Sequence, residues 1–215
     1  MEPLKVGVIG LGTVASGVAS VLSKNQADIT RRITRTPIIE KVFVRTLERE
    51  NPYQLNLTTD IDEIINNHDI DIVIELIGGI EPALTYIKTA LTNGKSVITA
   101  NKELIALHGN ELLRLAEENK VFLRFEASVA GGIPILKTLR EGLAANQIDS
   151  VMGIINGTSN YILTEMTDKG ADFSECLKEA QALGYAEADP TFDIKGIDAA
   201  HKLTILASTA FGMPL

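Results

Sequence analysis

The sequence has a single cysteine, Cys176, among its 215 residues. One cysteine excludes a disulfide framework within the chain and is typical of a protein from a reducing compartment. Cys176 falls in a stretch whose apolar residues recur at helical spacing, so we interpret it as a small buried side chain and not as a nucleophile. A thiol-dependent dehydrogenase would need its cysteine in a glycine-rich or electropositive setting.

Long apolar runs are also missing: none approaches the ~20 residues that a membrane-spanning helix needs. The first ten residues contain no basic leader with an apolar stretch and a small-residue cleavage site, so we expect no signal peptide and a cytoplasmic protein. Acidic residues outnumber basic ones, and the net charge of −8 argues against nucleic acid as a partner. The remaining composition is that of an ordinary globular protein.

Short apolar runs alternate with amphipathic patterns through the first 130 residues. Strands are predicted at Lys5–Gly10, Ile38–Arg45, Asp71–Ile77, Ser96–Ala100 and Val121–Val129. Helices are predicted at Thr13–Leu22, Asp60–Asn67, from Pro82 onward and at Asn101–Asn119, and the polar tract Ser23–Pro37 is interpreted as a connection. This alternation predicts an α/β fold with a doubly wound parallel sheet of the Rossmann type.

Two consecutive glycines, Gly131 and Gly132, interrupt this alternation. We therefore predict a first domain over residues 1–130 and a second over residues 131–215. In the second domain the pattern predicts helices at Pro134–Ala145, Thr158–Thr167, Asp172–Leu183 and Asp193–Phe211, and a strand at Ser150–Asn156. The residues Asn156-Gly-Thr-Ser159 are interpreted as a turn that caps the helix that follows. With its strand and helices, the second domain is expected to be of the α+β class.

A glycine-rich turn, Gly10-Leu-Gly12-Thr-Val-Ala15, follows the first predicted strand and opens a helix. Gly10 allows a tight turn, and Gly12 lets the backbone approach a pyrophosphate that the helix N-terminus attracts. Ala15 is a tolerated variant of the third glycine. The alternative is a plain turn between strand and helix, but the context favours dinucleotide binding by Gly10, Gly12, Thr13 and Val14.

The second predicted strand ends in Val44-Arg45, without the acidic residue that usually bonds the ribose 2′-hydroxyl of NAD. Asp28 has nearly the expected spacing but lies in a polar tract, where a solvated loop residue is the better interpretation. Arg45 can pair with a 2′-phosphate through its planar guanidinium, or can simply be a solvated charge. We favour NADP(H) as the cofactor, with NAD(H) as the alternative.

An acid-rich segment precedes a lysine near the end of the chain: Glu187, Asp189, Asp193 and Asp198 come before Lys202. Asp198 and Lys202 are four residues apart and share one face of a helix. Carboxylates can hold an ammonium group, and a lysine can exchange a proton with an oxygen, which suits a small polar substrate. Taken alone, the pair could be an ordinary helix ion pair of about 0.2–0.5 kcal/mol.

The same segment resembles the signature of homoserine dehydrogenases, A-x-x-x-G, an aromatic residue, then D-P-x-x-D-I-x-G-x-D-x-x-x-K. Every fixed position is filled, by Ala180, Gly184, Tyr185, Asp189, Pro190, Asp193, Ile194, Gly196, Asp198 and Lys202. The resemblance extends from Val6 to the C-terminus. It implies an NAD(P)H-dependent reduction of aspartate 4-semialdehyde to homoserine, a step towards threonine, methionine and isoleucine.

The resemblance also implies roles for two lysines. Lys202 would donate a proton to the carbonyl oxygen as hydride reaches the aldehyde carbon. Lys102, in the segment Thr99–Lys102, matches a family lysine near nicotinamide and substrate and would assist. The alternative interpretation of Lys102 is an ordinary lysine on the solvent-exposed face of a helix, although the helix dipole makes a lysine in the first turn somewhat unfavourable.

Further positions follow from the resemblance. Glu187 and Asp198 would bind the ammonium and hydroxyl ends of homoserine, with Asp193 supporting them. Gly184 would approach the cofactor.

The segment Phe125–Pro134 resembles the place where the family binds a monovalent cation, commonly sodium. The implied ligands are the Glu126 side chain and the carbonyls of Val129, Gly131 and Ile133. The alternative is a glycine-rich hinge between domains.

The family's catalytic region continues beyond the helix that carries Lys202, so the resemblance implies a C-terminally truncated member without a regulatory domain. Once its sheet is complete, the protein is expected to form a homodimer. An inactive nucleotide-binding or dimerisation module is the alternative function. A Rossmann-type reductase of the dihydrodipicolinate reductase kind is a more distant rival, since it would need a basic, histidine-rich motif and this chain has three histidines.

Overall fold

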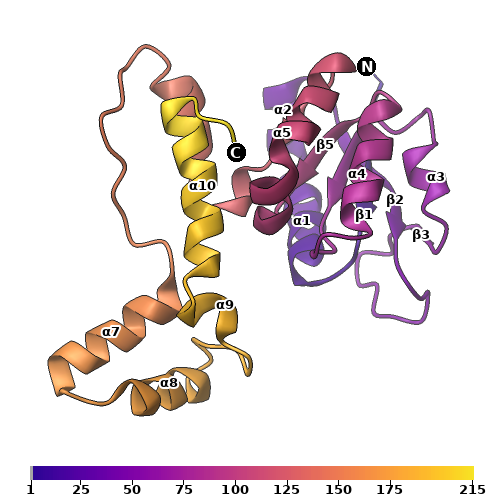
Figure 1. Ribbon diagram of the computed structural model, residues 1–215. Coiled ribbons are helices and arrows are strands. Elements are labelled where there is room, and N and C mark those ends of the chain that lie inside the picture. The colour runs from indigo at the N-terminus through magenta and orange to yellow at the C-terminus, as the bar shows by residue number, and fades with distance from the viewer. Residues whose placement is uncertain (1) are drawn as a thin grey trace. The chain divides into compact units, whose positions relative to one another are not determined.

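The computed structural model describes residues 2–215. These residues form two compact units that divide between Ser128 and Val129 (Figure 1). Each unit is described by itself below.

The first unit is built on one six-stranded parallel sheet. Its strands are β1 (Leu4–Ile9), β2 (Pro37–Phe43), β3 (Leu57–Thr58), β4 (Ile72–Glu75), β5 (Ser96–Thr99) and β6 (Leu123–Arg124). They lie in the order β3-β2-β1-β4-β5-β6, and every neighbouring pair is parallel. This is the strand order of a doubly wound dinucleotide-binding fold, so the predicted architecture is confirmed.

Apolar runs form these strands because both faces of the sheet are covered by helices. Ile9, Val42, Val73 and Val97 are completely buried, one on each of the four central strands. A strand buried on both faces needs a near-continuous apolar sequence, which is the pattern of β1 and β4.

Five helices cover the sheet: α1 (Thr13–Lys24), α2 (Gln26–Ile33), α3 (Asp62–Ile65), α4 (Ala83–Thr92) and α5 (Lys102–Glu118). Helices α1 and α2 contact β2, whereas α4 contacts α3 on one side and α5 on the other (Figure 1). Right-handed crossovers place these two groups on opposite faces of the sheet. The direction of winding reverses between β1 and β4, and a crevice opens there at the carboxyl ends of the strands.

Two predictions for this unit are wrong. The polar tract Ser23–Pro37, interpreted as a connection, contains the helix α2, whose residues are all at least partly exposed. The strand predicted at Val121–Val129 is shorter, because β6 pairs with β5 only at Leu123 and Arg124. The chain then turns at Glu126–Ser128, where the Ser128 hydroxyl donates to the Phe125 carbonyl at 2.5 Å.

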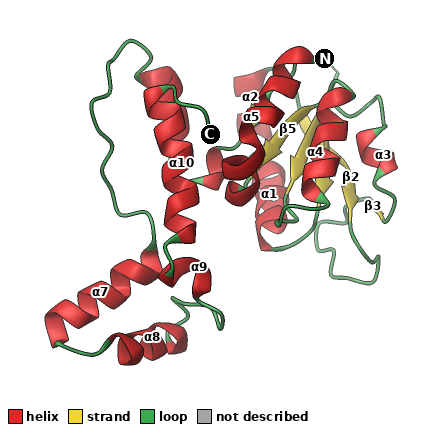
Figure 2. Ribbon diagram, viewed as in Figure 1, coloured by secondary structure: helices red, strands yellow, loops and turns green. Residues whose placement is uncertain are grey.

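In the described residues of the second unit, 129–215, Figure 2 shows helices and loops but no strand. The helices are α6 (Ile135–Lys137), the π-helical turn η2 (Thr138–Gly142), α7 (Gly157–Lys169), α8 (Phe173–Ala182), α9 (Thr191–Ile194) and α10 (Ile197–Phe211). Helices α7 and α8 pack together around Ile162, Cys176 and Ala180.

The strand predicted at Ser150–Asn156 is therefore not formed. The segment is an irregular loop in which Met152 is 96% exposed and Ile154 78% exposed. A strand needs a hydrogen-bonded neighbour, and the described residues of this unit supply none.

The helix predicted at Asp193–Phe211 is two helices. Gly196 takes φ 72°, a left-handed conformation that ends α9 and starts α10. As a result, Asp193 lies on the short helix α9 and not on α10.

Candidate active site

A crevice of about 570 Å³ lies at the carboxyl ends of β1, β2 and β4. Gly10 has φ 101° and donates its amide to the Phe43 carbonyl at 2.9 Å, which joins the start of the turn after β1 to the end of β2. Gly12 is the N-cap of α1, and a Cβ placed on it would meet no atom within 4 Å. The first turn of α1 has no acidic side chain and no side-chain cap, so its amides can bind an anion.

Two arginines line the same crevice. Arg45 follows β2 and is exposed, as expected for a residue that meets a cofactor or solvent. Arg49, which sequence reasoning did not single out, donates a hydrogen bond from its guanidinium to the carbonyl of Leu11 in the glycine turn. Two guanidinium groups beside a helix N-terminus make this part of the crevice suited to phosphate.

The predicted cofactor residues are only partly brought together. Gly10, Gly12 and Arg45 line the crevice, and Thr13 and Val14 follow at the exposed start of α1. Lys102 begins α5 at the carboxyl end of β5, in the same unit but outside the lining. Gly184 belongs to the second unit, in a left-handed turn with φ 78° after α8.

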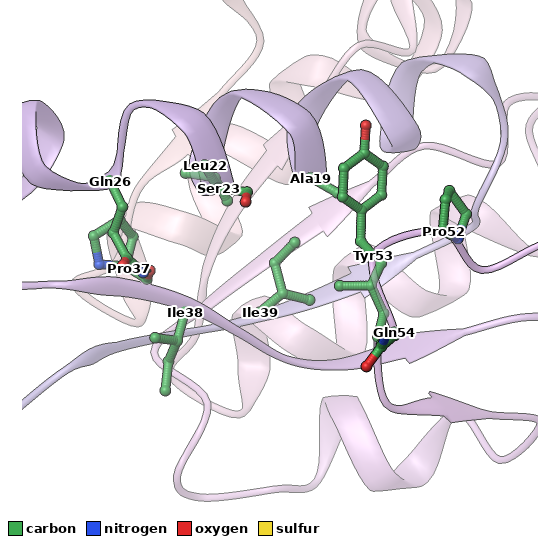
Figure 3. Close-up of a pocket in the computed structure, with 11 residues that line it drawn as sticks. Ala19, Leu22, Ser23, Gln26, Pro37, Ile38, Ile39, Pro52, Tyr53 and Gln54 are labelled. Carbon is green, nitrogen blue, oxygen red and sulfur yellow. Dashed lines mark hydrogen bonds between the residues drawn. The ribbon is translucent and has the colours of Figure 1, made fainter.

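A second hollow of about 420 Å³ in the first unit differs in its chemistry. It lies between the C-terminal part of α1 and β2, and Figure 3 shows Ile39 of β2 and Tyr53 of the following loop on its wall. Its polar lining consists of neutral groups, among them Ser23, Gln26 and Gln54. The absence of a cation from this lining makes it unsuited to a pyrophosphate, and the crevice with the arginines remains the nucleotide candidate.

The second unit has a polar hollow of about 530 Å³ between α7, α9 and α10. Asp198 and Lys202 face it from α10 with side chains 10% and 20% exposed. The Lys202 ammonium donates to Asp198 Oδ2 at 2.5 Å and to the Ile155 carbonyl at 2.7 Å. The lysine is thus held at the wall of the hollow by one carboxylate and one carbonyl.

Asn156 connects this pair with Asp193. Its amide nitrogen donates to Asp193 at 2.7 Å and to Asp198 at 2.9 Å. Its side-chain oxygen caps α7 by accepting from the Ser159 amide at 2.8 Å, which confirms the predicted helix cap. The Thr158 hydroxyl also lies 3.0 Å from Asp193.

The predicted substrate residues do not all meet in this hollow. Asp193, Asp198 and Lys202 line it, whereas Glu187 is exposed on the loop before α9 and is outside the lining. The contribution of Asn156 was missed because its partners lie 37 and 42 residues further along the chain. The local sequence Asn-Gly-Thr-Ser signalled only the cap.

The predicted cation ligands span the division between the units. Glu126 lies in the turn after β6, and Val129, Gly131 and Ile133 belong to the second unit. The Ile133 carbonyl already accepts the Ile135 amide at 2.8 Å. One carboxylate and several carbonyls are a donor set of oxygens, which hard cations prefer. In the described part of the chain, no cluster of three His, Cys, Asp or Glu side chains could hold a metal ion.

The thiol of Cys176 is buried between α7 and α8, as expected from its spacing. Burial raises the pKa of this thiol, and the negative charges of Glu165 and Glu179 act in the same direction. A thiol with a raised pKa is a poor nucleophile, so the geometry does not favour thiol chemistry.

The strand order and the glycine turn at the reversal point define this chain as a dinucleotide-binding α/β protein. Two family models match it: the NAD-binding domain of homoserine dehydrogenase at residues 10–126 and homoserine dehydrogenase at residues 134–215.

The chain is 54% identical over 219 residues to the homoserine dehydrogenase of Pseudomonas aeruginosa, covering all of this chain and 50% of that protein. The crystal structure of a Thiobacillus denitrificans homoserine dehydrogenase matches with a TM-score of 0.94 and 56% identity over 99% of this chain and 50% of that one. A hyperthermophilic archaeal homoserine dehydrogenase in complex with NADPH matches with a TM-score of 0.85 and 28% identity, covering 100% and 71%.

The chain belongs to the homoserine dehydrogenase family and contains its NAD-binding domain. It spans about half the length of the curated relatives it matches. Among the helices of residues 2–215, none has the length and hydropathy to cross a membrane.

Proposed function

We propose that this chain carries the cofactor-binding part, residues 1–130, and a large share of the substrate-binding part, residues 131–215, of an NAD(P)-dependent homoserine dehydrogenase. The reaction is the reversible reduction of L-aspartate 4-semialdehyde to L-homoserine, in the synthesis of threonine, methionine and isoleucine. The observation that carries the proposal is the Lys202 ammonium, held by Asp198 at the wall of a polar hollow.

In this proposal Lys202 is the proton donor. When bound, the nicotinamide cofactor supplies the hydride for the aldehyde carbon. Lys202 gives a proton to the carbonyl oxygen as that oxygen gains negative charge, and it takes the proton back in the reverse direction. Asp198 and the Ile155 carbonyl hold its side chain in place. Lys102, at the start of α5, assists in polarising the same oxygen.

The carboxylates select an amino-acid substrate. Asp198 and Glu187 bind the ammonium and hydroxyl ends of homoserine, and Asp193 supports Asp198 through the shared Asn156 amide. Glu187 is on an exposed loop, so this role requires the loop to approach the hollow. Gly184 precedes the same loop and lets its backbone approach the cofactor.

We favour NADP(H) over NAD(H). Arg45 and Arg49 line the crevice beside the glycine turn and can pair with a 2′-phosphate. Thr13 and Val14, at the start of α1, bring their backbone to the pyrophosphate beside Gly10 and Gly12. The ratio of the dissociation constants for NADPH and NADH tests the preference, and Arg45→Ala is expected to bring that ratio towards one.

We also propose sodium as a bound cation, with Glu126 as its charged ligand beside the carbonyls of Val129, Gly131 and Ile133. The donor set is all oxygen. Melting temperatures in sodium chloride and in a large organic cation chloride at equal ionic strength test this. A sodium-specific rise that Glu126→Gln abolishes supports the site, and equal melting curves argue against it.

The activity test follows cofactor absorbance after the 215-residue chain is mixed with NADPH and aspartate semialdehyde. Turnover that Lys202→Ala abolishes supports the proposal. Lys202→Arg is also expected to be inactive, since an arginine keeps the charge but does not release its proton. Lys195→Ala is the matched control, because Lys195 is an exposed lysine outside the hollow and its loss should leave the rate unchanged.

The same sample distinguishes an active enzyme from a chain that only binds the cofactor. NADPH binding without turnover would identify the chain as a nucleotide-binding module and not an enzyme by itself. We propose a homodimer for the protein once its sheet is complete, and the mass from light scattering of a chain as long as the relatives tests it. We also propose a cytoplasmic location and a small-molecule substrate as the main partner.

A further inference from the structure

Glu75 is the last residue of β4, and its side chain is completely buried. A buried carboxylate costs free energy unless hydrogen bonds compensate its lost hydration. All three groups that donate to it are neutral: the amides of Ile77 and Gly78 reach Oε1 at 2.8 and 3.2 Å, and the Thr99 hydroxyl reaches Oε2 at 2.6 Å. The carboxylate therefore joins the ends of two neighbouring strands, β4 and β5.

The first connection shapes the loop after β4. Two amides on one oxygen curl the chain at Ile77 and Gly78, and Gly78 and Gly79 continue it with φ 71° and 72°. Ile77 packs directly against the glycine turn, since a Cβ on Gly10 would come within 2.8 Å of the Ile77 Cγ2 atom. Glu75 thus fixes the wall on which the Gly10 turn rests.

The second connection continues into α5. The Thr99 hydroxyl accepts from the Asn101 amide at 3.0 Å. The Asn101 side chain caps α5 by accepting from the Leu104 amide at 3.1 Å, and it donates to the Gly79 carbonyl at 2.6 Å. These bonds form a closed ring that runs from β4 through β5 to α5 and returns to the loop after β4. Lys102 follows Asn101 directly in the sequence, as the first residue of α5.

We infer that Glu75 is a positioning residue that holds the β4–α4 and β5–α5 loops in fixed relation to each other and thereby sets the shape of the nucleotide crevice. The inference rests on the proposed function in taking a nicotinamide dinucleotide as the ligand. Glu75 itself stays covered and acts through Ile77, Gly78 and Thr99.

The test uses the partner hydroxyl of Thr99, so that the result does not depend on whether a Glu75 variant folds. Thr99→Val removes the hydroxyl at nearly constant shape, and Thr99→Ser keeps it. Glu75→Gln is a second variant. Only the oxygen of an amide accepts hydrogen bonds, so glutamine cannot accept at both of the positions that the Glu75 oxygens occupy. Lys95→Met is the matched control: Lys95 is a buried polar residue just before β5, at the opposite end of the sheet, where it donates to the Ile70 carbonyl at 3.1 Å.

Two readouts are measured on each variant. The first is the dissociation constant for NADPH from cofactor fluorescence. The second is amide hydrogen exchange in the free protein, with the Ile77 and Gly78 amides compared with the Val73 amide in the middle of β4.

Thr99→Val and Glu75→Gln are expected to weaken NADPH binding about tenfold or more, as when an anchoring hydrogen bond to a charged group is lost. The Ile77 and Gly78 amides should exchange faster relative to Val73. Thr99→Ser should restore both values. Lys95→Met should lower the melting temperature while leaving NADPH binding and the relative exchange unchanged.

Thr99→Val with unchanged relative exchange at Ile77 and Gly78 overturns the inference, as does an effect of Lys95→Met equal to that of Thr99→Val. If the wild-type chain does not bind NADPH, the proposed cofactor role fails by itself. The exchange ratios then still decide whether Glu75 couples the two loops.

Discussion

Lys202 and Asp198 lie one turn apart on α10, with 2.5 Å between the ammonium nitrogen and Asp198 Oδ2. Both side chains are largely buried, at 20% and 10% exposure. A pair that is partly removed from water gains more from its attraction than a surface pair does, but it leaves a costly unpaired charge when one member is lost. The pair therefore contributes both to stability and to the proposed proton transfer.

Asp198→Asn is expected to lower the free energy of unfolding by about 1–3 kcal/mol, because the partly buried lysine loses its charged partner. Turnover should also fall, since Lys202 is no longer held at the wall of the hollow. Urea unfolding and the rate of NADPH oxidation measure the two effects.

The matched control is Glu118→Gln in α5, which breaks the ion pair of Arg114 and Glu118 at the same spacing but on the surface. This change should cost less than about 0.5 kcal/mol. Equal losses for the two variants would contradict the interpretation of Asp198 and Lys202 as a site pair.

Asn156→Asp is expected to destabilise the second unit even though aspartate caps helices as well as asparagine does. The change removes the amide that lies between Asp193 and Asp198 and adds a third carboxylate beside them. Crowded carboxylates raise the pKa of at least one of them in the folded state. The repulsion among the carboxylates, which destabilises the folded state, then grows as the pH rises through that raised pKa and is relieved in acid.

The measurement is the difference in melting temperature between wild type and Asn156→Asp at about pH 5 and pH 8, and the difference should be larger at pH 8. Asn146→Asp adds the same charge at an exposed position and should behave like wild type at both values. A pH-independent difference would show that the lost amide matters and the added charge does not.

Local patterns in the sequence were sufficient for the strands β1, β2, β4 and β5, the glycine turn and the Asn156 cap, because each depends on residues close together in the chain. The helix α2 was missed since Gln26–Ile33 is mostly polar and buries no residue completely. The strand at Ser150–Asn156 was wrong because strand formation depends on a partner that the apolar pattern does not specify. The break at Gly196 was missed because a glycine can also continue a helix at a modest cost.

The candidate site also contains some contacts that the sequence predicted and others that it did not. The pairing of Asp198 with Lys202 follows from helical periodicity and was predicted. The ring around Glu75 depends on Thr99, 24 residues away, and on a carboxylate inside an apolar run that gave no local signal. Contacts of this range are set by how β4 and β5 pair, which periodicity alone does not determine.

Cys176 is expected to react with a thiol reagent only after unfolding. The thiol is buried and its pKa is raised, so little thiolate is present and the reagent has no access. A colorimetric thiol titration should show slow reaction in buffer and complete reaction in denaturant. Activity should survive the reagent under native conditions, and rapid inactivation would reopen a role for the thiol.

Lys95 is expected to make stability depend on pH in the alkaline range. Burial lowers the pKa of this amine below its ordinary value of 10.5. The negative charges of Asp71 and Asp69 act in the opposite direction but have the smaller effect. The folded state therefore loses the proton at lower pH than the unfolded state does, and stability rises with pH through that window. The neutral amine still donates to the Ile70 carbonyl.

The check is the difference in unfolding free energy between wild type and Lys95→Met, measured in urea from neutral pH to about pH 10. The difference should shift in favour of wild type as the pH rises, because the other titrating groups are common to both proteins. A shift in favour of Lys95→Met would contradict the lowered pKa.

The two glycines of the turn after β1 should respond differently to alanine. At Gly10 the left-handed φ of 101° and the approach of Ile77 leave no room for a Cβ, so Gly10→Ala should destabilise the free protein. At Gly12 the φ is −96° and a Cβ meets no atom within 4 Å, so the melting temperature of Gly12→Ala should be unchanged or slightly raised.

NADPH affinity should nevertheless fall for Gly12→Ala, because the added methyl occupies the space that a pyrophosphate needs. Gly17→Ala, inside α1 and equally open, should raise the melting temperature, because alanine favours a helix interior over glycine, and it should leave NADPH affinity unchanged. If Gly12→Ala binds NADPH as tightly as wild type does, the pyrophosphate does not lie at this helix terminus and the proposed cofactor site is wrong.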